Sequence, residues 1–136
     1  MRAAGITALG EPVEIFEVDE PATPAAGEVL IDVVAAGIGN WDELVRIGSW
    51  QIGGPPPMAL GTSAAGTVAA VGSGVLELRE GDEVMTHPLP LRRHGTWAEK
   101  VLAPAAAVAA RPPEASWEAC GAFPIPALTA AQALDE

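Results

Sequence analysis

The residues with the clearest chemical potential lie in segment 37–48, which reads GIGNWDELVRIG. Asn40, Trp41, Asp42 and Glu43 come together where an extended pattern gives way to a helical one. Enzymes often carry functional side chains at such corners between elements. An amide, an indole and two carboxylates can bind a polar ligand or exchange a proton, so this corner is a candidate site.

A metal site has little support in the spacing of ligand-type residues. His87 and His94 stand seven positions apart, and no third Cys, His or carboxylate neighbours them at ligand spacing. We interpret both as partly exposed loop histidines. Cys120 is the only cysteine and has no neighbour in the sequence that would activate it, so we expect a small buried apolar residue.

Two glycine-rich stretches resemble nucleotide-binding loops only superficially. GTSAAG at 61–66 and VGSGV at 71–75 have the wrong spacing for a dinucleotide or phosphate loop, and extended sequence follows them instead of a helix. We expect tight turns and closely packed strands here. Trp50 precedes the proline cluster at 53–61, where it either walls an apolar pocket or covers the core.

Composition excludes several classes of partner. The formal net charge is −11, from 18 acidic and 7 basic residues, which argues against nucleic acid and anionic membranes. The longest alanine-rich runs reach about half of the ~18 apolar residues that a spanning helix needs. No signal-peptide core precedes Glu11, and a single cysteine fits a reducing compartment. We therefore expect a soluble cytoplasmic protein.

Gly and Pro divide the chain into short apolar runs, which is typical of β-structure. We expect strands at 3–8, 13–18, 28–36, 64–71, 82–87, 96–102 and 107–111. The strand at 28–36 should be central, with both faces mostly covered.

Helical patterns occur at 40–47, after Ser116 and at 127–134. Asn40 and Ser116 are the expected N-caps of the first two helices. In the first, Leu44 and Ile47 should share the face that packs on the core, while Asp42 and Glu43 suit the start of the helix as charges.

Six segments in order make the chain resemble a known family. These segments are MRAAGITALGEP, PAAGEVLIDVVAAGIGNWDELVRIG, ALGTSAAGTVAAVGSGV, LREGDEVM, GTWAEKVLAP and PIPALTAAQAL. Together they make the chain similar to the N-terminal GroES-like domain of the medium-chain dehydrogenase/reductase superfamily, most closely to the zinc-independent quinone oxidoreductase-like members.

The resemblance implies a mainly β fold, a GroES-like partly open β-barrel with a few short helices. Residues 1–126 would form this domain, and residues 127–136 would begin the linker helix toward a Rossmann domain that this chain lacks. The family arrangement places NADPH in the cleft between the two domains.

The same resemblance addresses zinc. In zinc-dependent relatives a Cys and a His stand at the positions of Gly39 and Asn40, and a His-Glu pair stands at those of Thr62 and Ser63. The structural zinc lobe, expected after Met85, has no cysteines here. The resemblance therefore implies no zinc and a direct hydride transfer from NADPH.

Site roles follow from the resemblance alone. It implies that Asn40, Trp41 and Thr129 lie near the nicotinamide and that Trp50 and Thr62 face the substrate. Similar proteins often carry Tyr at two of the nearby positions, in the loop of Trp50 and in the GTWAE motif, but this chain contains no Tyr. The catalytic proton donor is therefore unassigned.

Two functional hypotheses remain open at this point. The first is the substrate-domain portion of a zinc-free NADPH-dependent oxidoreductase acting on a small apolar carbonyl, quinone or enone. By itself it would be inactive and would not bind NADPH tightly. The second is a stand-alone GroES-like module without redox activity, which binds a small apolar ligand or a partner chain, including a second copy of itself. A Rossmann-domain partner chain would belong to the first hypothesis.

Overall fold

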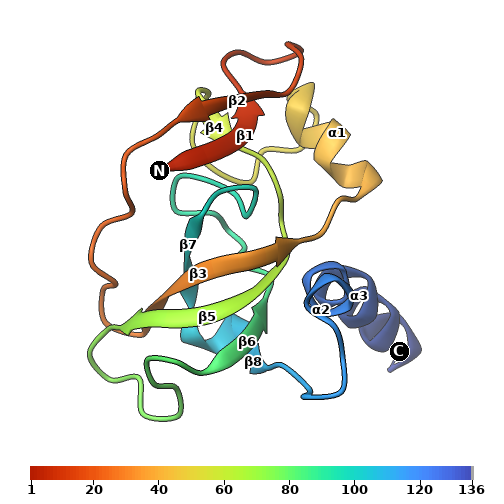
Figure 1. The fold of residues 1–136 in the computed structure, drawn as a ribbon. Coiled ribbons are helices and arrows are strands. Elements are labelled where there is room, and N and C mark those ends of the chain that lie inside the picture. The colour runs from red at the N-terminus through yellow and green to blue at the C-terminus, as the bar shows by residue number, and fades with distance from the viewer. Residues whose placement is uncertain (136) are drawn as a thin grey trace.

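A computed structural model describes residues 1–135 as a mainly β domain with two antiparallel sheets and three short helices (Figure 1). The smaller sheet has the order β2-β1-β4, formed by Glu14–Glu17, Arg2–Ile6 and Met58–Ala59. The larger sheet has the order β7-β3-β5-β6-β8, formed by Lys100–Pro104, Glu28–Ala36, Ala64–Val71, Glu83–Thr86 and Val108–Ala110.

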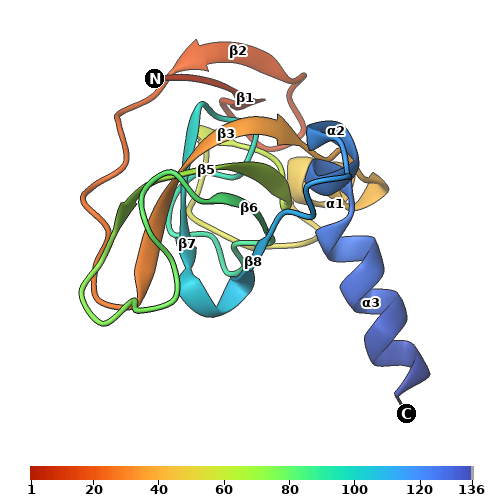
Figure 2. The same cartoon turned by 60° about the horizontal axis from the view of Figure 1, so that its bottom comes forward.

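The helices lie at one side of the sheets. They are α1 (Asn40–Arg46), α2 (Trp117–Ala122) and α3 (Pro124–Leu134), with a 3₁₀ turn, η1, at Ala105–Ala107. Helix α2 packs on β3 and β5. Figure 2 shows that α3 extends away from the sheets toward the C-terminus. Within residues 1–135, no helix combines the length and apolarity needed to cross a membrane.

The two sheets meet along a short segment before β7. Ala98 forms an isolated antiparallel bridge with Ala3, and the Ala4 N–H donates to the Trp97 carbonyl at 2.7 Å. The predicted strand at 96–102 is therefore divided, because its first part pairs with β1 and its second part, as β7, pairs with β3. The two sheets of the described residues do not close into a barrel, in agreement with a partly open GroES-like fold.

Strand β3 lies in the interior of the larger sheet, between β7 and β5, as predicted, although β5 occupies the middle position. Its two faces differ. Val29 and Ile31 are fully buried, whereas Asp32 is exposed and Val34 is 54% exposed. The expectation that both faces are mostly covered was wrong. One face packs into the core and the outer face near the end of the strand is open to solvent, which is common in antiparallel sheets.

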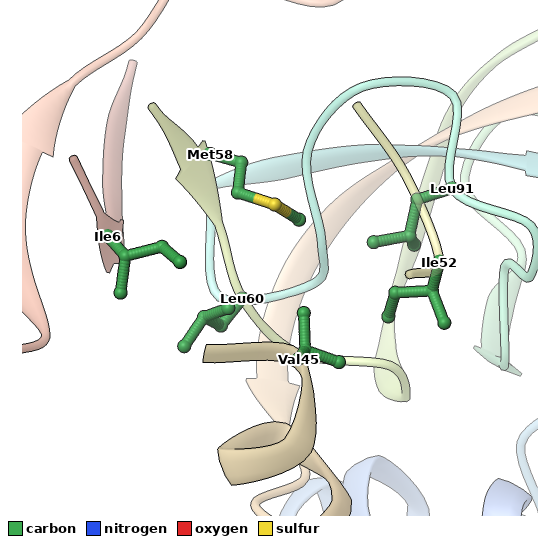
Figure 3. Close-up of a cluster of buried hydrophobic side chains, with 6 residues drawn as sticks. All are labelled: Ile6, Val45, Ile52, Met58, Leu60 and Leu91. Atoms are coloured by element: carbon green, nitrogen blue, oxygen red, sulfur yellow. The ribbon is translucent and has the colours of Figure 1, made fainter. Parts of the chain in front are cut away.

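An apolar cluster joins α1 to the smaller sheet (Figure 3). Trp50 is half-buried and packs against this cluster, so it does cover the core. A second cluster fills the larger sheet. The members of the first cluster are Ile6, Val45, Ile52, Met58, Leu60 and Leu91, and those of the second are Val29, Ile31, Val68, Val84, Val101 and Ala103.

Helix α1 is rotated relative to the predicted orientation. Val45 faces the core at 4% exposure, whereas Leu44 and Ile47 are 46% and 45% exposed, so the predicted core face was wrong. Positions 42 and 45 are one helical turn apart and face inward together. The N-cap is Gly39 and not Asn40, which is already the first helical residue.

The C-terminal helices begin close to the predicted positions. The Ser116 hydroxyl accepts a hydrogen bond from the Ala119 N–H at 3.1 Å, which confirms the predicted cap of α2. Helix α3 begins at Pro124, three residues before the predicted start. Proline suits the first turn of a helix because its missing N–H would have no partner there. Cys120 is buried, as expected.

The contribution of the first cluster can be tested with two isoleucines of the paired strands β1 and β2. Ile6 is fully buried and Ile15 is 78% exposed. We expect Ile6→Ala to lower the free energy of unfolding by about 2–5 kcal/mol, because it removes buried methyl groups and leaves a cavity. Ile15→Ala should change it by less than about 0.5 kcal/mol. Urea denaturation measures both, and equal losses would contradict the assignment of the core.

Candidate functional site at the corner of α1

The corner is built where two distant segments of backbone meet. The Gly37 N–H donates to the Ser63 carbonyl at 3.0 Å. The indole Nε1–H of Trp41 donates to Thr62 Oγ1 at 2.7 Å. Thr62 and Ser63 are both buried. The start of α1 is therefore fixed to the segment that leads into β5.

A third segment, residues 96–97, is hydrogen-bonded to the first two. The Thr96 hydroxyl donates to the Ser63 carbonyl at 2.9 Å, and the Trp97 indole donates to the Gly37 carbonyl at 2.8 Å. Both bonds join residues that lie far apart in the chain. Because buried polar groups are costly without partners, these bonds favour one arrangement of the three segments.

Two glycines permit the close approach of the segments. Gly61 has φ of +92°, and a Cβ built on it would lie 2.3 Å from Cδ1 of Trp97. Gly39 has an ordinary extended backbone, but a Cβ there would lie 2.2 Å from Cε2 of Trp41. The ring of Trp41 thus covers the space beside Gly39 where a larger residue would place its side chain.

Asp42 lies in the first turn of α1 and is only 3% exposed. Its Oδ2 accepts the Gly39 N–H at 2.8 Å, while its buried Oδ1 has no hydrogen-bond partner. Burial raises the pKa of the Asp42 carboxyl, and the N–H groups of Gly39 and Gly61 partly offset that rise. The neighbouring Glu43 is exposed, and its pKa is lowered by its hydrogen bond with Arg46.

The structure brings some of the predicted site residues together and leaves others apart. It brings Trp41 and Thr62 into direct contact, and Asn40 is exposed beside them at the start of α1. Thr129 is exposed on α3 and Trp50 covers the core, and among the described residues no hydrogen bond links either side chain to the corner.

Sequence reasoning missed two contributors to the corner. The burial of Asp42 was unexpected, although an acid three residues after the N-cap is a common capping arrangement. Trp97 was visible in the GTWAE motif, but nothing in the sequence indicated that its indole would bond to Gly37.

Neither histidine completes a metal site in the described part of the chain. His94 Nδ1 accepts the Ala59 N–H at 3.3 Å, and burial lowers the pKa of its imidazole. Residues 1–135 contain no group of three or more His, Cys, Asp or Glu side chains arranged to hold a metal ion. His94 thus has a structural partner in the backbone.

Residues 25–113, which include the whole corner, match the family described as the alcohol dehydrogenase GroES-like domain. The chain belongs to this family. It is therefore a GroES-like domain of the medium-chain dehydrogenase/reductase superfamily, which confirms the broader part of the resemblance seen in the sequence.

Relatives of this GroES-like domain include oxidoreductases. An alcohol dehydrogenase of Moraxella sp. (strain TAE123) is 38% identical over 84 residues, covering 62% of this chain and 25% of its own length. The human synaptic vesicle membrane protein VAT-1 homolog-like protein superposes with a TM-score of 0.87 at 31% identity, covering 98% of this chain and 42% of that one.

A structure of Escherichia coli quinone oxidoreductase complexed with NADPH also matches the domain. Its TM-score is 0.76 at 30% identity, and the match covers 89% of this chain and 36% of that one. This chain spans about a quarter of the length of the Moraxella relative and roughly two fifths of the two matched structures.

The contact between Gly39 and Trp41 can be tested with a double-mutant cycle. We expect Gly39→Ala to destabilise the domain by about 1–3 kcal/mol, because the added methyl group must displace the indole ring. In a Trp41→Ala background the same change should cost less, giving a coupling energy of about 1–2 kcal/mol. Urea denaturation of the four proteins measures it.

Gly54→Ala provides the control for this cycle, since a Cβ at Gly54 would meet only Arg93 Nη1, at an ordinary 3.5 Å. Its effect should not depend on Trp41. Additive effects of Gly39→Ala and Trp41→Ala would show that the ring does not occupy this space.

The raised pKa of Asp42 makes a second prediction, about pH. The folded protein holds the Asp42 proton more tightly than the unfolded chain, whose value is near 3.8. Stability from this residue is therefore present below that value and is lost as pH rises through the raised folded pKa. We expect the wild type to lose stability relative to Asp42→Asn as the pH rises above about 4. Urea midpoints measured at increasing pH test it, and a difference that grows in the opposite direction would contradict it.

Proposed function

We propose that this domain forms the substrate side of a zinc-free, NADPH-dependent oxidoreductase that reduces quinones, enones or similar carbonyl compounds. The observation that carries the proposal is the match of 89% of this chain to Escherichia coli quinone oxidoreductase, whose structure contains NADPH. The complete activity would require a nucleotide-binding domain in addition to this one. The alternative of a module without redox activity gains no support from the relatives described above.

The proposal that zinc is not used rests on the donor set of the corner. Gly39 provides no side chain, and Thr62 and Ser63 provide buried hydroxyls where zinc sites use thiolate, imidazole or carboxylate ligands. The Trp41 ring also lies against Gly39, in the space that a ligand side chain would need. The residues present do not fit a catalytic zinc ion, and we derive no step through one.

The residues of the corner do fit a flat, partly apolar ligand such as a nicotinamide ring. Bound NADPH would supply a hydride, which this chain cannot supply. Trp41 is half-buried and presents an aromatic surface, and Asn40 adds an exposed amide for hydrogen bonding. Thr62 is buried and accepts the Trp41 N–H, so we propose that its main role is to fix the indole orientation.

The other predicted site residues take weaker positions in this proposal. Thr129 is exposed on α3, where it can meet a ligand or a second domain. Trp50 would shape the substrate side only through its exposed edge, because the rest of its ring packs on the core. We retain both as proposed contacts. We also propose a cytoplasmic location, on the evidence of composition alone.

An assay of NADPH oxidation with a panel of quinones and enones tests the function. We expect turnover when the domain is fused to the nucleotide-binding part of Escherichia coli quinone oxidoreductase, and none from the domain alone. Trp41→Ala should lower kcat/KM by about tenfold, because it removes the aromatic surface. A metal chelator should have no effect.

Leu76→Ala is a suitable control for this assay, since Leu76 is exposed in a loop outside the corner. Its activity should equal that of the unchanged fusion. A folded fusion that ignores quinones and enones, or that oxidises alcohols only after zinc is added, would contradict the proposal.

A further inference from the structure

Asp42 stands apart from the other acidic residues of the described chain because it alone is fully buried. Burying a carboxylate is costly unless its oxygens find partners. Here one oxygen is paired and the other is not. An exposed acid would serve equally well to favour the start of a helix, as Glu43 does one residue later. Charge at the helix start therefore does not explain the buried position.

The surroundings of Asp42 point to a role between the two segments of the corner. Its Oδ2 binds the N–H of Gly39, two residues before Trp41. The N–H of Gly61, the residue immediately before Thr62, lies close enough to the carboxyl to lower its pKa. The Asp42 side chain thus bonds to the segment that carries Trp41 and lies close to the segment that carries Thr62.

We propose that Asp42 is a positioning residue, which fixes Gly39 beneath the Trp41 ring at the start of α1 and thereby sets the Trp41–Thr62 hydrogen bond. It acts through its hydrogen bond to the Gly39 N–H and touches no ligand itself. The relevance of this role to NADPH rests on the proposed function, whereas the role itself is a property of the domain alone.

The unpartnered Oδ1 is consistent with this role. Because half of the hydrogen-bonding capacity of the carboxyl is unused, its burial costs stability. Loss of the carboxyl releases the Gly39 N–H, and Gly39 packs against the Trp41 ring. The indole then loses the fixed backbone that orients it toward Thr62.

The test is the indole N–H resonance of Trp41 in ¹⁵N-labelled 136-residue protein without any ligand. Trp41→Phe assigns the signal among the four tryptophans. Thr62→Val removes the acceptor and defines the position of the unbonded indole. We expect Asp42→Ala to move the Trp41 signal toward the Thr62→Val position and to make its proton exchange with water about tenfold faster. The Trp97 indole signal should move less.

Two further variants separate positioning from general destabilisation. Asp42→Asn keeps an acceptor for the Gly39 N–H and should restore most of the wild-type Trp41 signal. Val45→Ala removes a buried side chain of the same helix one turn away and should leave the signal in place despite a loss of stability.

A Trp41 signal that is unchanged in Asp42→Ala, or that moves equally in Val45→Ala, would overturn the proposal. If Asp42→Ala does not fold, an Asp42→Asn signal at the Thr62→Val position would overturn it instead. Because the readout requires no NADPH, failure of the proposed function in the activity assay would leave this result unaffected.

Discussion

The corner of the domain depends on how closely three backbone segments approach one another. Gly61 lets the segment before β5 pass beneath Trp97, and Gly39 leaves room for the ring of Trp41. Once the backbones are this close, the indole groups of both tryptophans reach acceptors on a neighbouring segment. Interior packing is dense enough that one added methyl group at such a contact must displace something. The two indole hydrogen bonds therefore depend on the close backbone approach that Gly39 and Gly61 allow.

The carboxyl of Asp42 illustrates the balance between stability and placement. Burial makes the charged form unfavourable, yet the residue bonds to the N-cap of α1. Natural proteins often retain costly arrangements at functional sites, where a less strained residue would give a more stable but less suitable structure. In its proposed role, Asp42 sets the geometry of Trp41 at the expense of stability. This role accounts for a buried carboxyl with one unpaired oxygen.

Much of the fold could be predicted from the sequence, because Gly and Pro mark the strand ends and the apolar runs between them are short. The interior place of β3 in its sheet and the Ser116 cap are examples that the structure confirms. The short strand β4 was missed because it lies within the proline cluster at 53–61 and has only two residues. The rotation of α1 was misjudged because Leu44 and Ile47 fit a helical face as well as Val45 does. Tertiary packing, which a local pattern does not contain, decided between them. The roles of the site residues came from family resemblance and stay predictions, as do the domain boundaries at 126 and 127.

The junction between α2 and α3 has a mechanical consequence. Phe123 is both the last cap of α2 and the first cap of α3, and its backbone stays helical at φ −72° and ψ −40°. No loop separates the two helices, so there is little slack to absorb a rotation of α3. Helix α2 packs on β3 and β5, and its Gly121 carbonyl lies beside Gly37 at the base of the corner. The direction of α3 is therefore tied, through α2, to the backbone at Gly37, which accepts the Trp97 indole.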